Sequence, residues 1–101
     1  MIIKRLLRGE KPMIEEVEGT LLPNESSLAI IHDKDAKRWY VIDLPTGLSV
    51  ATGITKKACI ARYEDRKSAY NSIILAPFYK ERIKEFNDLC QTSKKTLSKN
   101  S

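Results

Sequence analysis

Metal-binding side chains are scarce in this sequence. The chain has two cysteines, Cys59 and Cys90, and one histidine, His32. A structural zinc site takes four such ligands, usually in closely spaced pairs, and the sequence contains no CxxC pair. We therefore expect neither a metal centre nor a cofactor, and we interpret both cysteines as buried thiols in a reducing compartment. A disulfide or a reactive thiol is the alternative.

Long apolar runs are also missing. The longest contain four residues, as in residues 28–31, whereas a membrane-spanning helix needs about 20. The first eleven residues contain apolar pairs that are separated by Lys4, Arg5 and Arg8. They therefore lack the continuous apolar core of a secretory signal. We expect a cytoplasmic protein that does not contact a membrane.

The sequence signatures of common enzymes are absent as well. The chain contains no GxSxG, GxxxxGK[ST] or HExxH motif. His32 is followed by Asp33 and Asp35, which could in principle hold a metal or form an acid–base pair. Aspartate is common in turns because it accepts hydrogen bonds from nearby backbone, and this explains the same residues without catalysis. We do not expect an enzyme.

The positive charge of this small basic protein is unevenly distributed. The 101 residues carry a net charge of +5. Residues 1–11 contain four basic groups and one acidic group, residues from Lys94 onward contain three basic groups and no acidic group, and residues 12–93 sum to −1. The total charge therefore does not by itself define a nucleic-acid-binding face.

The centre of the chain predicts antiparallel strands. Residues 27–33 and 37–44 are rich in β-branched and aromatic side chains and are joined by a short polar turn. Residues 48–51 follow the turn at Pro45–Gly47 as a third strand. In the second strand Trp39 and Val41 share one face, and Tyr40 and Ile42 share the other. We expect this strand to be covered on both faces, with Trp39 in the core; stacking of the two rings on nucleic-acid bases is the alternative.

Two helices are predicted after the strands. Thr55 can cap a helix over residues 56–75, and Pro77 ends it and begins a second helix that ends near residue 91. The second helix should bury a stripe of four residues, which are Tyr79, Ile83, Phe86 and Cys90. The fold class is therefore α+β: a small antiparallel sheet of three or four strands, followed by two C-terminal helices that pack on one side.

The chain is predicted to be a single domain over residues 1–101. Residues 26–91 form the core, and residues 92–101 are a flexible basic tail. Residues 1–25 are ambiguous, since Ile14, Val17 and Leu21 fit a helix that begins near Pro12, whereas residues 17–22 fit a strand almost as well.

A basic cluster at the first predicted helix is the candidate binding site. Lys56 and Lys57 occupy the first turn, where the helix dipole favours acidic side chains. Their position suggests an external anionic partner, and we predict that they contact phosphates together with Arg62, Arg66 and Lys67. The alternative is an ordinary solvated first turn.

Short motifs in the same region resemble three families. Gly53, Thr55, Lys56 and Lys57, with Cys59 in place of a packing alanine, resemble the Gly-x-Ser-Lys-Lys-x-Ala pattern with which double-stranded RNA-binding domains hold phosphates. The DLPTG segment followed by Gly-x-Thr is similar to HicB-type antitoxins. The hairpin, turn and helix also resemble the arm-binding domain of tyrosine integrases. These resemblances imply a local β-β-β-α arrangement but different partners, and we assign the chain to none of the families.

The function predicted from the sequence is a small non-enzymatic binding module. It is expected to associate with nucleic acid, either DNA or RNA, through phosphate contacts at the start of the first helix. The alternative is a protein-binding regulator or inhibitor, of the accessory type found in mobile elements. The acidic residues Glu15, Glu16 and Glu18 form a solvated face, or else a contact for a basic partner.

Overall fold

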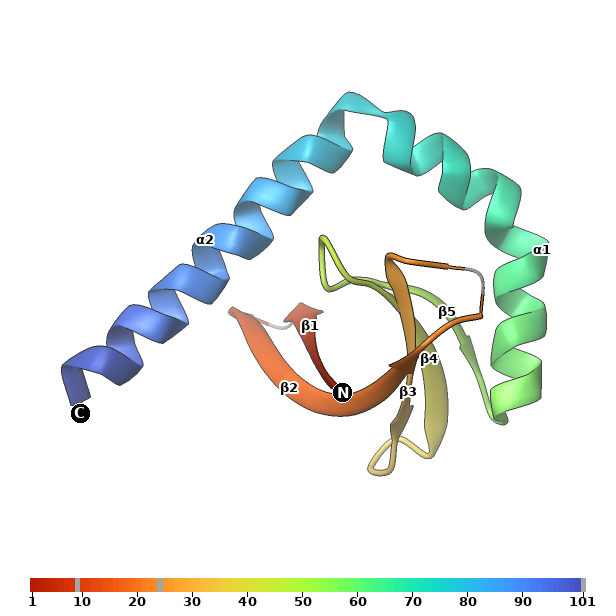
Figure 1. Cartoon of the computed structure of the whole chain (residues 1–101), viewed down its shortest axis with the longest axis horizontal. Helices are drawn as coiled ribbons and strands as arrows, with labels where there is room; N and C mark the ends of the chain where they lie inside the picture. Colours follow the sequence, from red (N-terminus) through yellow and green to blue (C-terminus); the bar gives the residue numbers. More distant parts are fainter. Residues whose placement is uncertain (9, 24, 101) are drawn as a thin grey trace.

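The computed structural model describes residues 1–8, 10–23 and 25–100, together with their side chains except those of residue 8 and residues 92–100. These residues form an α+β fold in which an antiparallel sheet of order β1-β2-β3-β4-β5 precedes two helices (Figure 1). The elements are β1 (Ile2–Arg8), β2 (Pro12–Leu21), β3 (Leu28–Asp33), β4 (Arg38–Asp43), β5 (Ser49–Gly53), α1 (Lys56–Leu75) and α2 (Pro77–Asn100).

The sheet has five strands, which is more than the three or four expected. The ambiguous N-terminal region forms β1 and β2, so the helix considered from Pro12 is wrong. The spacing of Ile14 and Val17 suits a helix, but in the structure each lies opposite an apolar residue of β1, Leu6 and Ile3 respectively. A cross-strand partner that is distant in sequence therefore outweighs the local periodicity.

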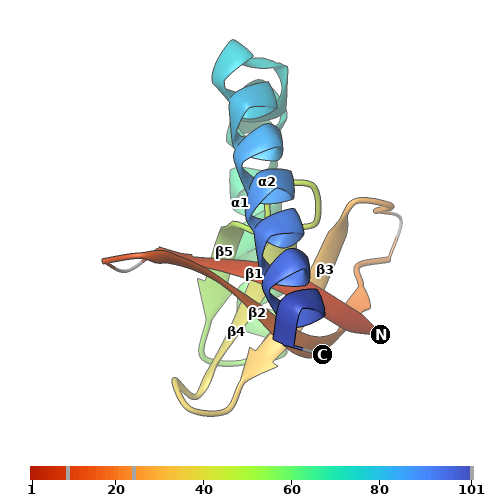
Figure 2. The ribbon, with the colours of Figure 1, turned by 90° about the vertical axis from the view of Figure 1, so that its left-hand side faces the viewer.

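Strand β2 bends, and this bend places β1 over the sheet. Its first part pairs with β1, and its last part, from Gly19 to Leu21, pairs with β3. A Cβ atom at Gly19 would lie 2.7 Å from the Ile31 side chain and 2.9 Å from that of Ile3, so only glycine fits at the crossing. Figure 2 shows the β1–β2 hairpin running across β3 and β4.

Both faces of the central strands are buried, as the sequence predicted. The hairpin covers a core of Ile3, Ala29, Ile31 and Ile42. Helix α1 covers the opposite face, where the core residues are Leu22, Leu28, Ile30, Val41, Ala51, Cys59, Tyr63 and Tyr70. Figure 1 shows α1 and the β1–β2 hairpin on opposite sides of β3, β4 and β5.

Helix α1 has the predicted bounds because both of its ends are encoded locally. The Thr55 hydroxyl oxygen accepts a hydrogen bond of 3.0 Å from the backbone N–H of Ala58, which caps the first turn. Pro77 cannot continue the helix and begins α2 instead. The backbone of α2 runs to Asn100, past the predicted end near residue 91, since no glycine or proline interrupts it.

A buried carboxylate connects the two helices to the sheet. Asp43 at the end of β4 accepts hydrogen bonds from the hydroxyl groups of Tyr70 in α1 and of Tyr79 in α2, the latter at 2.8 and 2.9 Å. The Thr46 hydroxyl donates a third, at 2.6 Å. Burial, followed by the nearby Asp43 carboxylate, raises the pKa of Tyr79 to about 12.

Phe86 gives α2 its second contact with the sheet. It is buried, whereas the other predicted members of the stripe, Tyr79, Ile83 and Cys90, are half-buried. The Phe86 ring lies against Gly47, where φ is +69° and an added Cβ would come within 2.5 Å of a ring carbon. Glycine at this turn therefore provides both the backbone conformation and the space for the ring.

Candidate nucleic-acid interface

The five predicted contact residues occupy different sides of α1. The buried stripe of the helix runs through Cys59, Tyr63 and Tyr70. At 3.6 residues per turn, Lys56 and Lys67 lie on one flank of this stripe, whereas Arg62 and Arg66 lie on the other. The contacts of these residues agree with this division: Lys56 lies near Trp39, whereas Arg62 and Arg66 line a groove beside β5. The basic residues that are close in sequence therefore belong to two separate surfaces.

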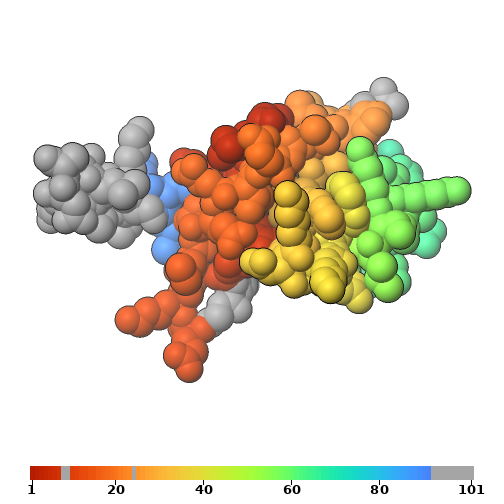
Figure 3. All heavy atoms as spheres, turned by 90° about the horizontal axis from the view of Figure 1, so that it is seen from below, coloured from red at the N-terminus to blue at the C-terminus, as the bar shows by residue number. Residues whose placement is uncertain are grey.

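We call the first surface the lysine end, which consists of His32, Trp39, Lys56 and Lys57. Trp39 and His32 are cross-strand neighbours, and their rings are stacked with centroids 4.4 Å apart and an interplanar angle of 14°. The Lys56 ammonium lies 6.0 Å from the centre of the Trp39 ring. Lys57 is exposed beside it, and the first turn of α1 contains no acidic residue. Figure 3 shows the β3–β4 hairpin and the beginning of α1 side by side on this face.

Trp39 is only half-buried, which differs from the expected core position. Its β4 neighbour Val41 is fully buried beneath α1. Trp39 lies at the end of the sheet, opposite Gly53, where α1 has only just begun. Only the beginning of α1, with Lys56, therefore lies near the Trp39 ring, and His32 is stacked on the ring.

Asp33 and Asp35, which follow His32, belong to the turn between β3 and β4, as expected from the preference of aspartate for turns. The Asp33 carboxylate accepts hydrogen bonds from the backbone N–H groups of Asp35 and Ala36, at 3.1 and 3.0 Å. It also pairs with Arg5 at 2.8 Å. The Ala36 N–H, and then Arg5, hold the pKa of Asp33 below its usual value. The Asp33 carboxylate is therefore held by the turn and by Arg5, and Asp35 belongs to the same turn through its backbone N–H.

Lys67 is engaged in positioning α1. Its ammonium lies 3.5 Å from the carboxylate of Glu25, in the connection between β2 and β3. The same carboxylate accepts a hydrogen bond of 3.2 Å from the Tyr63 hydroxyl. Burial, and then Glu25, raise the pKa of Tyr63 to about 12. Lys67 thus has an internal counter-ion.

We call the second surface the β5 edge, which consists of β5 with Arg62 and Arg66. These arginines and β5 line a groove of about 130 Å³ together with Tyr40. Neither arginine forms an ion pair with another described residue. A neighbouring groove of about 140 Å³ shares Tyr40 and Ser49, so the two continue each other along the strand.

Arg5 borders this neighbouring groove but is neutralised. Its guanidinium pairs with Glu15 at 3.0 Å and with Asp33 at 2.8 Å, and its side chain is 10% exposed. The guanidinium also lies 5.6 Å from the centre of the Tyr40 ring. Despite desolvation, which acts in the opposite sense, these acidic partners raise the pKa of Arg5. Arg62 and Arg66 therefore supply the unneutralised charge of the β5 edge.

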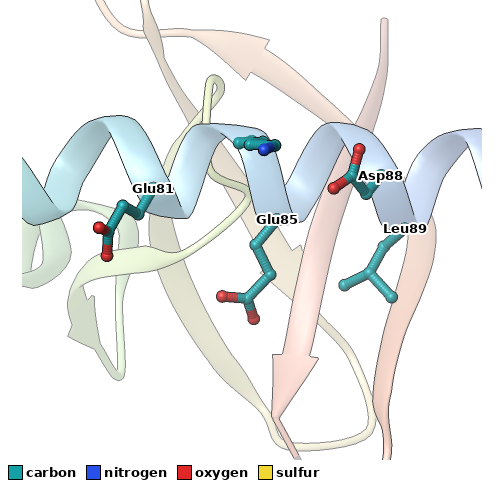
Figure 4. Close-up of a pocket in the computed structure, with 5 residues that line it drawn as sticks. Glu81, Glu85, Asp88 and Leu89 are labelled. Atoms are coloured by element: carbon teal, nitrogen blue, oxygen red, sulfur yellow. The ribbon is translucent and has the colours of Figure 1, made fainter.

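Another surface hollow lies on α2, and its lining is mainly acidic. It measures about 360 Å³ and is lined by Glu81, Lys84, Glu85, Asp88 and Leu89. Figure 4 shows Glu81, Glu85, Asp88 and Leu89 in succession along the helix. Three carboxylates against one lysine disfavour an anion here.

The described residues include no cluster of three or more His, Cys, Asp or Glu side chains placed to hold a metal ion. Cys59 and Cys90 are not bonded to each other, and burial raises the pKa of Cys59. No described helix combines the length and apolar character that crossing a membrane requires.

Comparisons with known proteins place the chain in no family. A scan against protein-family models finds no match, and searches of curated proteins and of solved structures find no similar protein. The resemblances to double-stranded RNA-binding domains, antitoxins and integrase arm-binding domains therefore stay predictions.

Two features of these surfaces were not predicted from the sequence. The stacking of His32 on Trp39 depends on strand register, although alternation within the predicted hairpin could have placed them opposite each other. The approach of Arg5 to Tyr40 depends on β1, a strand that the sequence did not identify. In the fold, Asp43 was predicted only as a residue of the second strand, and nothing local indicates that two distant tyrosines converge on it.

Proposed function

We propose that the protein is a non-enzymatic module that binds nucleic acid at the lysine end. The observation that carries the proposal is the position of the Lys56 ammonium over the Trp39 ring, which is itself stacked on His32. Cations beside flat, accessible rings provide both interactions that nucleic-acid strands use, namely phosphate pairing and base stacking. The positive end of the α1 dipole adds to the attraction for phosphate.

The proposed phosphate contacts are confined to Lys56 and Lys57. Lys67 already has Glu25 as a counter-ion. Arg62 and Arg66 face the groove beside β5, on the other flank of α1. A strand bound across the Trp39–His32 stack therefore meets the two lysines first.

The test compares two double variants that remove the same charge from the same helix. Lys56→Gln/Lys57→Gln should weaken binding of fluorescent single-stranded and duplex DNA and RNA. It should also reduce the slope of log binding constant against log salt by about 1.4 to 1.8, that is, about 0.7 to 0.9 for each of the two lost phosphate contacts. Arg62→Gln/Arg66→Gln should leave the slope nearly unchanged. Fluorescence anisotropy between about 50 and 300 mM salt measures both.

Tryptophan emission gives a second readout, because Trp39 is the single tryptophan of the chain. Base stacking should quench it. If the wild-type protein binds none of the nucleic acids at about 50 mM salt, the proposal is wrong. If both double variants reduce the slope equally, the bound strand follows both flanks of α1, as the sequence cluster originally suggested.

An apolar surface supports the second candidate function, a protein-binding regulator. Four large side chains at the junction of α1 and α2 are exposed: Ile73, Ile74, Leu75 and Phe78, with Leu75 84% exposed. Several large exposed apolar side chains within a few residues are a feature of protein contact sites. Binding of one stoichiometric protein from the native host, lost in Leu75→Ser but kept in Lys56→Gln/Lys57→Gln, would favour this function over nucleic-acid binding.

A further inference from the structure

Strand β5 has an open edge. It pairs with β4 on one side, and no described strand pairs with its other side. Strand β1 comes near, donating a hydrogen bond of 2.7 Å from the Leu6 N–H to the Gly47 carbonyl, but this contact precedes β5. Edges are usually protected by lysine, proline or bulges. Ser49–Gly53 contains no charged residue and no proline, and of these devices it has only a register shift, of the kind a β-bulge produces, at Val50.

The chemistry beside this edge favours an acidic partner. Arg62 and Arg66 line the groove along four consecutive β5 residues and have no acidic partner among the described side chains. The hydroxyl oxygen of Thr52, which also lines the groove, is buried without a hydrogen-bond partner. Buried polar atoms are nearly always hydrogen-bonded, so the Thr52 hydroxyl, which has no partner among the described residues, is an unsatisfied polar group beside the edge.

The spacing of the arginines matches an extended polypeptide. Residues four apart on a helix are separated by about 6 Å along its axis. Side chains two apart on a strand point the same way and are separated by about 6.6 Å. Two carboxylates at alternate positions of a strand added to β5 can therefore meet Arg62 and Arg66, one each.

Other occupants fit this edge less well. Tyr40 is the one aromatic side chain that lines the groove, and it is half-buried, so nucleic-acid bases find less exposed ring surface here than at the exposed His32 of the lysine end. A second copy that paired β5 with β5 would bring Arg62 and Arg66 of both copies together, and like charges repel. An extended acidic peptide uses both the backbone edge and the arginines.

We propose that the β5 edge binds an extended acidic polypeptide segment as an additional strand, with carboxylates at alternate positions paired to Arg62 and Arg66. Backbone hydrogen bonds to Ser49–Gly53 supply affinity, as in other proteins that bind peptides by strand addition. This surface does not depend on the nucleic-acid proposal, which concerns the other flank of α1.

The experiment titrates the full chain with a defined peptide, acetyl-Thr-Val-Glu-Val-Glu-Val-Thr-amide. Amide NMR spectra should show shifts in β5, and hydrogen exchange of the outward-facing β5 amides should slow. Arg62→Gln/Arg66→Gln, which changes two exposed side chains, should weaken binding about tenfold. Lys56→Gln/Lys57→Gln is the matched control and should bind the peptide normally.

Two altered peptides separate strand addition from simple charge attraction. N-methylation at alternate residues removes the donors that pair with β5 and keeps both carboxylates, so binding should be lost. Replacement of both glutamates by lysine keeps the backbone donors and should also abolish binding. Equal binding of either altered peptide overturns the proposal.

Three other results would overturn it as well. One is the absence of any peptide effect on β5. Another is a single-stranded oligonucleotide that shifts the β5 amides when the acidic peptide does not, which assigns the edge to nucleic acid. The third is a concentration-dependent dimer whose interface contains β5, which assigns the edge to a second copy.

Discussion

The lysine end and the β5 edge use the same helix and the same sign of charge, yet they present different chemistry. At the lysine end, Lys56 lies over Trp39, whose ring is stacked on an exposed histidine. At the β5 edge, Arg62 and Arg66 border a strand with an open side, and the one ring in the groove, Tyr40, is half-buried. Flat accessible rings suit bases, whereas an open backbone edge suits a polypeptide.

The comparison also shows why a cluster of basic residues in a sequence is a weak guide to a binding site. Lys67 lies on the same helix as the proposed contacts, and Arg5 borders the groove next to the β5 edge. Both, however, are neutralised, by Glu25 and by the pair Glu15 and Asp33 respectively. The residues that matter for an external anion are the cations whose neighbours leave their charge uncompensated.

The largest expected effect is that of Phe86→Asp, because unfolding would destroy both binding surfaces together. Phe86 is buried against Gly47, so Phe86→Asp would place an unpaired charge in the core that holds α2 on the sheet. We expect a loss of about 4 kcal/mol or more, or unfolding. Lys84→Asp, on the exposed face of α2, should stay within about 0.5 kcal/mol. Thermal unfolding followed by circular dichroism measures both, and equal tolerance would show that α2 is not docked.

Asp43→Asn should cause a smaller loss of stability and leave both binding surfaces intact in the folded protein. Asp43→Asn removes the charge that three hydroxyl groups share, at a fully buried position. We expect a cost of about 2 kcal/mol. Urea unfolding followed by Trp39 fluorescence measures it. Weaker binding of either ligand by the fully folded variant would mean that the carboxylate also shapes a binding surface.

A substitution of Thr55, the N-cap residue of α1, should affect the lysine end but not the β5 edge. Thr55→Ala removes the side-chain hydrogen bond to Ala58 and should cost about 1 kcal/mol. Fraying of the first turn displaces Lys56 and Lys57, so nucleic-acid binding should fall, whereas the β5 edge should still bind the acidic peptide. Parallel titrations with both ligands test this. Thr55→Ser, which restores the hydroxyl, should recover most of the stability and the binding.

Acid should weaken the ion pair of Asp33 with Arg5, which borders the groove next to the β5 edge. The pKa of Asp33 is lower in the folded protein than in the unfolded chain, because of the Ala36 N–H and Arg5. Its contribution to stability is therefore present above the unfolded pKa and is lost as the pH falls through the folded pKa. Urea midpoints between about pH 5 and pH 2 should decline less in Asp33→Asn than in the wild type. Asp65→Asn, at an exposed position on α1, serves as the control.

The smallest effect concerns the stability of the lysine end itself. Lys56→Gln/Lys57→Gln removes two positive charges from the positive end of α1, so stability should stay level or rise by about 0.5 kcal/mol. Arg62→Gln/Arg66→Gln, in the middle of the same helix, should show no such gain. A clear loss in the lysine variant, measured by urea unfolding at low salt, would show that the lysines have a structural role.

The central hairpin and α1 were predictable because their signals are local. Thr55, Pro77 and the β-branched residues around Val41 act on their immediate neighbours, and the structure has the elements that they indicate. The N-terminal strands were missed because Ile14 and Val17 are compatible with either periodicity. Their partners Leu6 and Ile3 lie in a separate segment of the chain.

The candidate site was predictable in composition but not in arrangement. The sequence identified all the cations of α1, and helical geometry alone places Lys56 and Arg62 on different flanks. What each flank faces was not predictable. Trp39 reaches Lys56 through the pairing of β4 with β5, and Tyr40 meets Arg5 only because β2 bends at Gly19.

The sequence by itself determined the α+β class, the bounds of α1, the central hairpin and the excess of cations on one helix. Each of these rests on interactions within a few residues, such as a cap, a turn or an alternation of side chains. Only the tertiary structure decided the five-strand order, the convergence of Tyr70 and Tyr79 on Asp43, and which cations keep their charge unpaired. These depend on contacts between residues far apart in the chain, which form when apolar faces are buried together.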